Sequence, residues 1–169
     1  MKFLPACETC VKSGFLCAKC QEKLDEEEIT PFELDLAKDL IEMEQKEKYE
    51  YLENVSFHKA IDYEDVVILV VGKGDKIRIG QELINWIKDI YEIDKIILVE
   101  KTGKPRSVLE SLIAPGKLIS LNEIFLATGD VEFRAVIRKA DKSKILFTRQ
   151  ELEELVKELT GQSIRVEFI

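Results

Sequence analysis

The spacing of apolar residues changes along the chain between helical and extended periods, which predicts a mixed α+β protein. Apolar residues recur every three to four positions from Phe32 to about Leu52, as in a long helix with one packed face. Thr30 and Pro31 precede this segment as a cap residue and a first helical residue. Val55–Ile61 and the uninterrupted apolar run Val66–Val71 then predict two strands, the second of them buried. The order continues as follows: helix Gln81–Tyr91, strand Lys95–Glu100, helix Ser107–Ala114, a strand within Lys117–Ala127, turn Thr128–Asp130, strand Val131–Ile137, one or two helical turns within Lys139–Leu146, helix Gln150–Leu159 capped by Gly161, and strand Ser163–Phe168.

This order repeats itself, because α-β-β-α-α-β occurs twice, with the short helix reduced to a turn in the first copy. Residues 72–76 (GKGDK) align with residues 138–142 (RKADK), each directly after an apolar strand. Residues 81–83 and 150–152 both read QEL at the start of a helix. The offset is 66 residues at the first pair and 69 at the second, so the first copy is three residues shorter in between. The repeat predicts two small modules in tandem.

All four cysteines lie near the N-terminus in two CxxC pairs, Cys7/Cys10 and Cys17/Cys20. Each pair can present two thiolates to one ion, and two pairs complete the tetrahedral four-sulfur shell that zinc prefers. Gly14 can adopt the positive φ that a short reversal between the pairs needs. The six-residue spacer predicts a compact loop of two knuckles, with at most a minimal hairpin.

Zinc with a structural role is the interpretation we favour for this array, because a closed four-thiolate site leaves no position open for catalysis. Two disulfides, a redox pair and an iron–sulfur site are the alternatives. Lys12, Lys19 and Lys23 lie nearby in sequence and would offset part of the site's negative charge. His58, the single histidine, is expected to be an ordinary packing residue.

Charge is distributed unevenly along the 169 residues, whose net charge is −8. Residues 1–53 hold 7 basic and 14 acidic side chains, so the remaining chain has a net charge near −1. Residues 134–149 hold six basic side chains against one acidic, a local charge of +5, and residues 101–117 have a net charge of +3. A nucleic-acid partner is therefore compatible with the second copy, although the bulk charge argues against non-specific coating of nucleic acid.

Other classes of function have little support in the sequence. The longest apolar runs are far shorter than the roughly 20 residues that span a bilayer, and no signal-peptide pattern precedes the cysteines. We therefore expect a cytoplasmic protein with no membrane partner. The sequence contains no phosphate loop, no Cys–His pair outside the cysteine array and no identifiable pair of carboxylates. We therefore expect neither an enzyme nor a small-molecule substrate.

The element order with the strand-Gly-Lys-Gly-Asp turn resembles the type II KH domain, and two copies in a row resemble the tandem KH unit of NusA-like transcription factors. The cysteine array ahead of them is similar to that of archaeal NusA-like proteins with an N-terminal zinc-binding segment. The resemblance implies an α+β fold of three parts: a zinc knuckle or ribbon over residues 1–28, then a long helix and a first KH-like module over 29–102, and a second module over 103–169. A KH domain clamps four nucleotides with a GXXG loop, whose glycines let the backbone approach phosphates.

The loop that corresponds to GXXG departs from that pattern in both copies. It falls at Phe147–Gln150 in the second copy, with neither glycine, and at Ile79–Glu82 in the first, with one glycine and a carboxylate. In the second copy, Thr148 and Arg149 remain able to contact phosphate, and Phe147 can stack on a base if it is exposed. The full set of nucleic-acid candidates is Lys73, Lys76 and Arg78 in the first copy and Arg138, Lys139, Lys142, Lys144, Phe147, Thr148 and Arg149 in the second.

The function that the resemblance implies is noncatalytic binding of single-stranded RNA, in association with RNA polymerase or the ribosome, during transcription elongation or termination. A protein–protein adaptor, in which the altered KH-like modules no longer bind RNA, is the alternative. Loss of capture at high salt would favour the RNA-binding hypothesis, because phosphate contacts weaken steeply with salt while an apolar interface persists.

Overall fold

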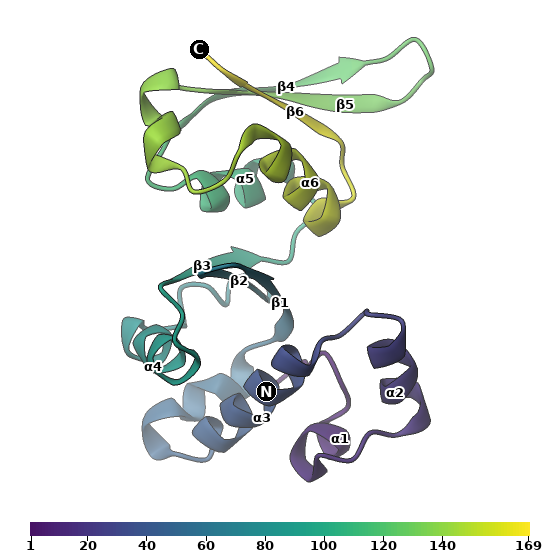
Figure 1. Cartoon of the computed structure of the whole chain (residues 1–169), viewed down its shortest axis with the longest axis vertical. Helices are drawn as coiled ribbons and strands as arrows, with labels where there is room; N and C mark the ends of the chain where they lie inside the picture. Colours follow the sequence, from purple (N-terminus) through teal and green to yellow (C-terminus); the bar gives the residue numbers. More distant parts are fainter. The chain divides into compact units, whose positions relative to one another are not determined.

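The computed structural model describes all 169 residues, and the chain divides into two compact units, Met1–Leu98 and Val99–Ile169. Each unit contains one three-stranded sheet (Figure 1). The fold is therefore α+β, as the apolar pattern predicted. None of the helices is long and apolar enough to cross a membrane.

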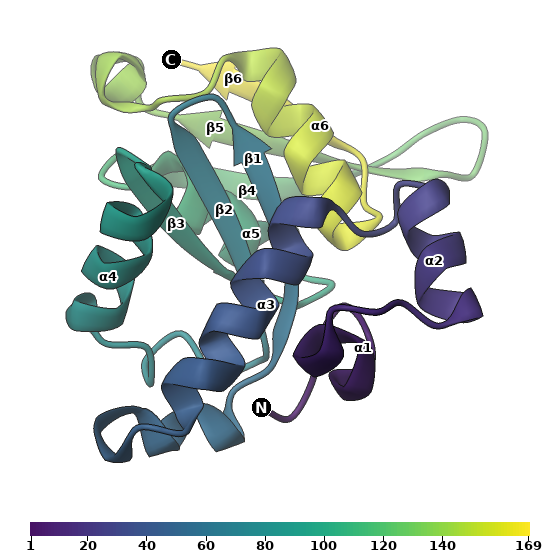
Figure 2. The same ribbon diagram turned by 60° about the horizontal axis from the view of Figure 1, so that its bottom comes forward.

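The first unit begins with two short helices and continues with a helix-and-sheet module. The module's sheet has the strand order β1-β2-β3, with β1 and β2 antiparallel. Helices α3 and α4 lie on the same face of this sheet (Figure 2). Its elements are α1 (Glu8–Ser13), α2 (Ala18–Asp25), α3 (Pro31–Glu44), the 3-10 helix η1 (Glu47–Asn54), β1 (Phe57–Tyr63), β2 (Val66–Val71), α4 (Gln81–Tyr91) and β3 (Lys95–Glu100), at whose end the second unit starts.

The second unit has the strand order β4-β5-β6, in which β4 and β5 are antiparallel and β5 and β6 are parallel. Helices α5 and α6 lie on one face of the sheet, and the hairpin that joins β4 to β5 extends beyond them (Figure 1). The turn of this hairpin contains Gly129 at φ 91°, in agreement with the predicted turn. Its elements are α5 (Pro105–Ile113), β4 (Leu118–Phe125), β5 (Val131–Ile137), the 3-10 helix η2 (Lys139–Lys144), α6 (Arg149–Thr160) and β6 (Ile164–Phe168).

Each unit has its own buried apolar side chains. In the first unit, Leu36 and Leu40 of α3 pack in one cluster with Leu83 and Ile87 of α4. Strand β2 is buried from Val67 onward, on both faces, as its uninterrupted apolar run predicted. In the second unit, the fully buried side chains include Leu109, Leu112, Ile113, Ile137 and Leu152.

The two copies of the internal repeat share an equivalent hydrogen bond from an aspartate side chain to the backbone. Asp75, in the turn after β2, accepts a hydrogen bond from the Ser56 N–H (2.9 Å) just before β1. Asp141, 66 residues later in η2, accepts one from the Lys117 N–H (3.3 Å) just before β4. Both aspartates are buried, and each also pairs with a cation three residues further on. The same aspartate therefore joins the two ends of the β-hairpin in both units.

One predicted element is wrong in extent. The helix expected from Phe32 to about Leu52 ends at Glu44, and η1 follows it. Acidic residues occupy the last turn of α3 with no basic residue, which is unfavourable at the negative end of a helix. Leu52 is nevertheless buried, because a 3-10 helix also brings residues three apart onto one side. Apolar spacing alone could not separate the two elements.

Candidate metal centre and nucleic-acid surface

The four cysteines occupy equivalent positions at the starts of two short helices. Cys7 is the N-cap residue of α1, and Cys10 lies in its first turn. Cys17 is the N-cap residue of α2, and Cys20 lies in its first turn. Gly14 ends α1 at φ 75°, which reverses the chain between the two pairs as predicted. Each CxxC pair opens a helix and no strand lies between them, so the optional minimal hairpin is absent.

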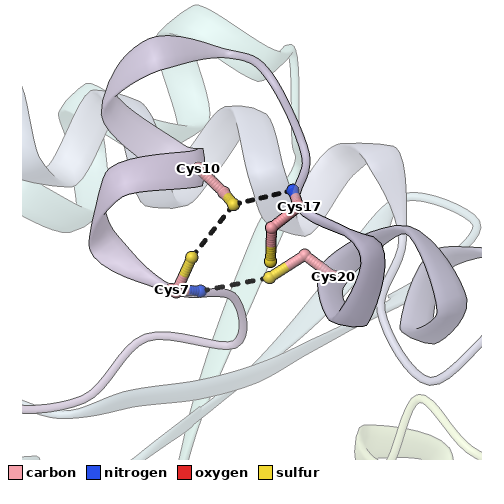
Figure 3. A group of neighbouring side chains, drawn as sticks. All are labelled: Cys7, Cys10, Cys17 and Cys20. Carbon is pink, nitrogen blue, oxygen red and sulfur yellow. Dashed lines mark hydrogen bonds between the residues drawn. The ribbon is translucent and has the colours of Figure 1, made fainter.

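The sulfurs converge on one point (Figure 3). All four Sγ atoms lie within 4.8 Å of one another, and those of Cys7 and Cys10 are 2.9 Å apart. Four Zn–S bonds of about 2.3 Å at tetrahedral angles would place the sulfurs about 3.8 Å apart. The cluster therefore matches the size of a shell around a single ion.

Backbone N–H groups point at the sulfurs in a reciprocal pattern (Figure 3). The Cys17 N–H donates to the Sγ of Cys10 (3.1 Å), and the Cys7 N–H donates to the Sγ of Cys20 (3.4 Å). Each CxxC pair thus holds a sulfur of the other pair. Such donors stabilise thiolates, as the starts of helices also do.

Without a metal ion, the pKa is lowered for two of the thiols and raised for the other two. The hydrogen bond with Cys10 lowers the pKa of Cys7, and the same contact raises the pKa of Cys10 to about 12. The backbone N–H of Cys20 lowers the pKa of Cys17 to about 7. The Cys7 N–H favours the Cys20 thiolate, but burial and neighbouring thiols together raise the pKa of Cys20. Binding of a metal ion as a four-thiolate site would therefore release protons, with Cys10 among the thiols that lose one.

The cluster is part of the first unit's core. Cys10 and Cys20 are buried and belong to the same apolar cluster as residues of α3, whereas Cys7 and Cys17 are exposed. The four cysteines are free thiols with no disulfide among them. The arrangement is compatible with a bound metal ion that fastens the two short helices to the module behind them.

The charged and aromatic neighbours of the cysteines have other contacts. Lys12 pairs with Glu8, and Lys23 donates to the Pro5 carbonyl oxygen (3.5 Å). His58 stacks against Phe3, with ring centroids 4.4 Å apart, and is not part of the cysteine cluster. Its predicted role as a packing residue agrees with this contact.

The loop before α6 does not offer the contacts that the sequence suggested. Phe147 is only 5% exposed, so its ring is not available to stack on a base. The Thr148 hydroxyl accepts the Glu151 N–H (3.3 Å), and the Glu151 carboxylate accepts the Thr148 N–H (2.7 Å). This capping box satisfies two of the N–H groups at the N-terminus of α6 and places a carboxylate there.

Ion pairs with glutamates outside the segment reduce the local charge of +5. Arg134 binds Glu167 (2.6 Å), and Arg149 binds Glu153 (3.1 Å). Lys144 pairs with Asp141, the one acidic residue already counted in the local charge of +5. The two added glutamates leave +3. The remaining candidates in this unit are Arg138, Lys139 and Lys142, all exposed, with the Lys142 ammonium 5.6 Å from the centre of the Phe168 ring.

Of the three candidates in the first unit, Arg78 is held by the fold. Its guanidinium donates to the Asn54 carbonyl oxygen (3.0 Å) and contacts Asp75 (3.5 Å). Lys73 and Lys76 are exposed. Lys76 also lies beside residues that the sequence did not single out.

A groove of about 350 Å³ lies between the first turn after β2, helix α4 and strand β3. Three lysines line it, together with a glutamine and three apolar side chains, and none of its lining residues is acidic. Lys88 and Lys95 are seven residues apart in sequence and on different elements, so only the folded structure brings them together with Lys76. The lining residues are Lys76, Gln81, Ile84, Lys88, Lys95, Ile96 and Leu98.

Comparison with known proteins gives no family for this chain. No protein-family model matches it, and no curated protein matches it. Among solved structures, it is similar to the crystal structure of APE1850, with a TM-score of 0.47 and 17% sequence identity over 71% of this chain and 91% of that one. This similarity is too weak to bring any property of APE1850 to the present chain.

Proposed function

We propose that this protein is a noncatalytic RNA-binding factor that binds single-stranded RNA in the lysine-lined groove of its first unit. The groove is the observation that carries the proposal. Its three ammonium groups suit the phosphates of a nucleic acid, and its apolar side chains suit the face of a base. The Gln81 Nε2 donates to the Asn85 Oδ1 (2.9 Å), and its amide oxygen is an acceptor that suits the edge of a base.

The start of α4 supports the same assignment. Gly80 is the N-cap residue of this 11-residue helix and has no side chain to cap it, and its N–H donates to the Tyr51 hydroxyl. The N-terminal end of a helix favours a negative ligand. The carboxylate of Glu82, which would repel phosphate, pairs with the Lys48 ammonium (2.7 Å). Groove and helix start thus offer positive potential on adjacent surfaces of the first unit.

The module architecture supports a KH-like assignment for both units. In the second unit, an antiparallel and a parallel neighbour flank the central strand, and the helices lie on one face. We propose that both units are type II KH-like modules and that the first is the one that binds RNA. Because a capping box occupies the start of α6, we propose a role other than RNA binding for the second unit. Association with RNA polymerase or the ribosome is part of this proposal, and copurification from native extract tests it.

Fluorescence anisotropy with a labelled single-stranded RNA tests the groove. Lys88→Ala and Lys95→Ala should each weaken binding and each reduce the slope of log affinity against log salt by about 0.7, the value for one phosphate contact on a single strand. Lys38→Ala, at an exposed position of α3, is the matched control and should change neither. Unchanged affinity in the double variant Lys88→Ala/Lys95→Ala would reject the groove, and an absence of RNA binding by the intact chain would favour the adaptor.

We further propose that the four cysteines hold one structural Zn²⁺. Four thiolates in a closed tetrahedral shell favour zinc over harder ions, and a single ion fits the size of the cluster better than an iron–sulfur cluster does. Metal analysis of purified protein should give about one zinc per chain. Iron with visible absorption would support the iron–sulfur alternative, and a folded protein without metal would reject the site.

A further inference from the structure

Two of the four cysteines are accessible to solvent, although the cluster is built into the core of the first unit. Cys7 and Cys17 are exposed, whereas Cys10 and Cys20 are only 3% and 4% exposed. In each CxxC pair, the exposed cysteine is the N-cap residue of a helix, and the buried one lies three residues further on. Both pairs therefore present one cysteine to solvent and keep its neighbour out of solvent.

This arrangement suits the oxidation of thiols. A cysteine binds a metal ion as a thiolate, which is also the form that reacts with oxidants. Susceptibility to oxidation follows thiolate character and exposure, and a second thiol nearby converts the first product to a disulfide. In a four-thiolate site, Cys7 and Cys17 combine thiolate character with exposure. Cys10 and Cys20 are the thiols beside them.

The backbone holds the two cysteines of each pair together. Residues three apart on a helix are neighbours on its surface. The sulfurs of Cys7 and Cys10 are 2.9 Å apart, so they need to approach by only about 1 Å to form a disulfide (Figure 3). A disulfide between Cys7 and Cys10, or between Cys17 and Cys20, closes a loop of four residues within one helical turn. A disulfide between the pairs would require both helices to remain in place after the ion has left.

We propose that both CxxC pairs are sites of oxidation by hydrogen peroxide, which closes a disulfide within each pair and releases the metal ion. The proposal rests on the four-thiolate zinc site proposed above. In the first pair, the Cys7 thiolate attacks one oxygen of the peroxide, the O–O bond breaks, and hydroxide leaves, so that Cys7 becomes a sulfenic acid. The Cys10 sulfur then attacks the Cys7 sulfur, forms the S–S bond and displaces a second hydroxide. The two sulfurs lose two electrons in total, which reduce one peroxide to two hydroxides.

Oxidation should loosen the two short helices. Each disulfide removes two of the four thiolates, and the two that remain do not complete a tetrahedral shell. Helices α1 and α2 have six and eight residues, and no side chain caps either of them. Helices of this length are not stable alone in water. Their stability therefore depends on packing and on the ion, and the loss of the ion should expose them to local unfolding.

Hydrogen peroxide in excess over the reduced, zinc-loaded full chain tests the proposal. A chromogenic chelator measures the zinc that is released, and tryptic mapping after alkylation of free thiols identifies the disulfides. A tryptic peptide of residues 3–12 contains both cysteines of the first pair, whereas those of the second pair lie on peptides 13–19 and 20–23. We expect complete release of zinc, an unlinked peptide 3–12 that is two hydrogens lighter, and a disulfide between peptides 13–19 and 20–23. Dithiothreitol should restore the binding of zinc.

Three results would overturn this assignment: a link between peptide 3–12 and either of the other two, cysteines oxidised without any disulfide, or zinc that peroxide does not release. A reduced protein without zinc would instead overturn the zinc site itself. The variants Cys7→Ser and Cys17→Ser each remove one exposed thiol. Cys7→Ser should close only the Cys17–Cys20 disulfide, and Cys17→Ser only the Cys7–Cys10 disulfide. If either variant does not fold, the map of the wild type decides the question.

Limited digestion of the native protein by trypsin tests the loosening of the helices. Lys12 in α1 and Lys19 in α2 are exposed, and cleavage after them requires local unfolding of their helices. Oxidation should accelerate both cleavages at least about tenfold. Lys157, at an exposed position of α6 in the second unit, is the control, and cleavage after it should not change. Unchanged cleavage after Lys12 and Lys19 would overturn the proposed loosening.

Discussion

Replacement of Glu33 by alanine should destabilise the first unit strongly, because this carboxylate joins two elements from a buried position. Glu33 is 1% exposed. One of its oxygens accepts the Ala60 N–H of β1 (2.7 Å), and the other accepts the Thr30 N–H at the start of α3 (2.8 Å). The side chain therefore completes a capping box and also fixes α3 to the edge of the sheet.

The magnitude follows from these two bonds. Loss of the acceptor leaves the Ala60 N–H buried and unsatisfied, which costs about 1–3 kcal/mol. Loss of half of the capping box costs about 0.5–1 kcal/mol more. We expect Glu33→Ala to reduce the free energy of unfolding by about 2–4 kcal/mol. Glu33→Gln retains one carbonyl oxygen as an acceptor and should lose less.

Urea denaturation followed by circular dichroism, at a fixed concentration of zinc, measures this loss. Glu42→Ala, on the exposed side of the same helix, is the control and should change the free energy of unfolding by less than about 0.5 kcal/mol. A loss below about 1 kcal/mol in Glu33→Ala would refute the reasoning, because it would mean that the buried N–H groups find other acceptors.

Three further predictions follow from the contacts of single groups. The apparent affinity for zinc, measured by chelator competition, should fall as the pH is lowered from 8 to 6. The reason is that neighbouring thiols raise the pKa of Cys10 to about 12 without metal, so this thiol must lose its proton when zinc binds. A pH-independent affinity would contradict four-thiolate binding. Gly72→Ala should cost about 1–3 kcal/mol by chemical denaturation, because a Cβ there would lie 2.3 Å from the Asp75 Oδ2, whereas Gly103→Ala meets nothing within 4 Å and should be nearly neutral. The hydrogen bond from Lys144 lowers the pKa of Asp141 below its ordinary 3.8, so this carboxylate stabilises the fold above that value and less as the pH falls through the lowered pKa. Asp141→Asn should therefore lose less stability than the wild type between about pH 4 and pH 2 in acid titrations of thermal unfolding.

Local signals in the sequence were sufficient for much of the fold. Thr30 and Pro31 predicted the start of α3, and the structure adds the capping box with Glu33. The uninterrupted run of β2 predicted a strand buried on both faces. The two CxxC pairs were sufficient to predict that four sulfurs meet, because this depends on spacing within 14 residues. These features depend on neighbours in sequence, and for that reason periodicity and motifs identified them.

Features that depend on distant residues were not predictable in the same way. The basic segment from Arg134 to Arg149 suggested a phosphate-binding surface, but Glu167, 33 residues from Arg134, reaches it only in the folded unit. The groove of the first unit was missed, because Lys88 and Lys95 are unremarkable in sequence and meet only through the packing of α4 against the sheet. Local charge counts therefore favoured the second unit, whereas the assembled surfaces favour the first.

The two units share the hydrogen bond that joins the ends of the β-hairpin, and they differ at the start of the helix that follows it. Asp75 and Asp141 make equivalent bonds, so the repeat preserves the device that joins the ends of each hairpin. The start of the following helix is uncapped at Gly80 in the first unit and closed by Thr148 and Glu151 in the second. A capping box satisfies two of the N–H groups at a helix start and places there a carboxylate that repels phosphate. The same architecture therefore carries two different helix starts: one without a capping box in the first unit, and one with its own carboxylate in the second.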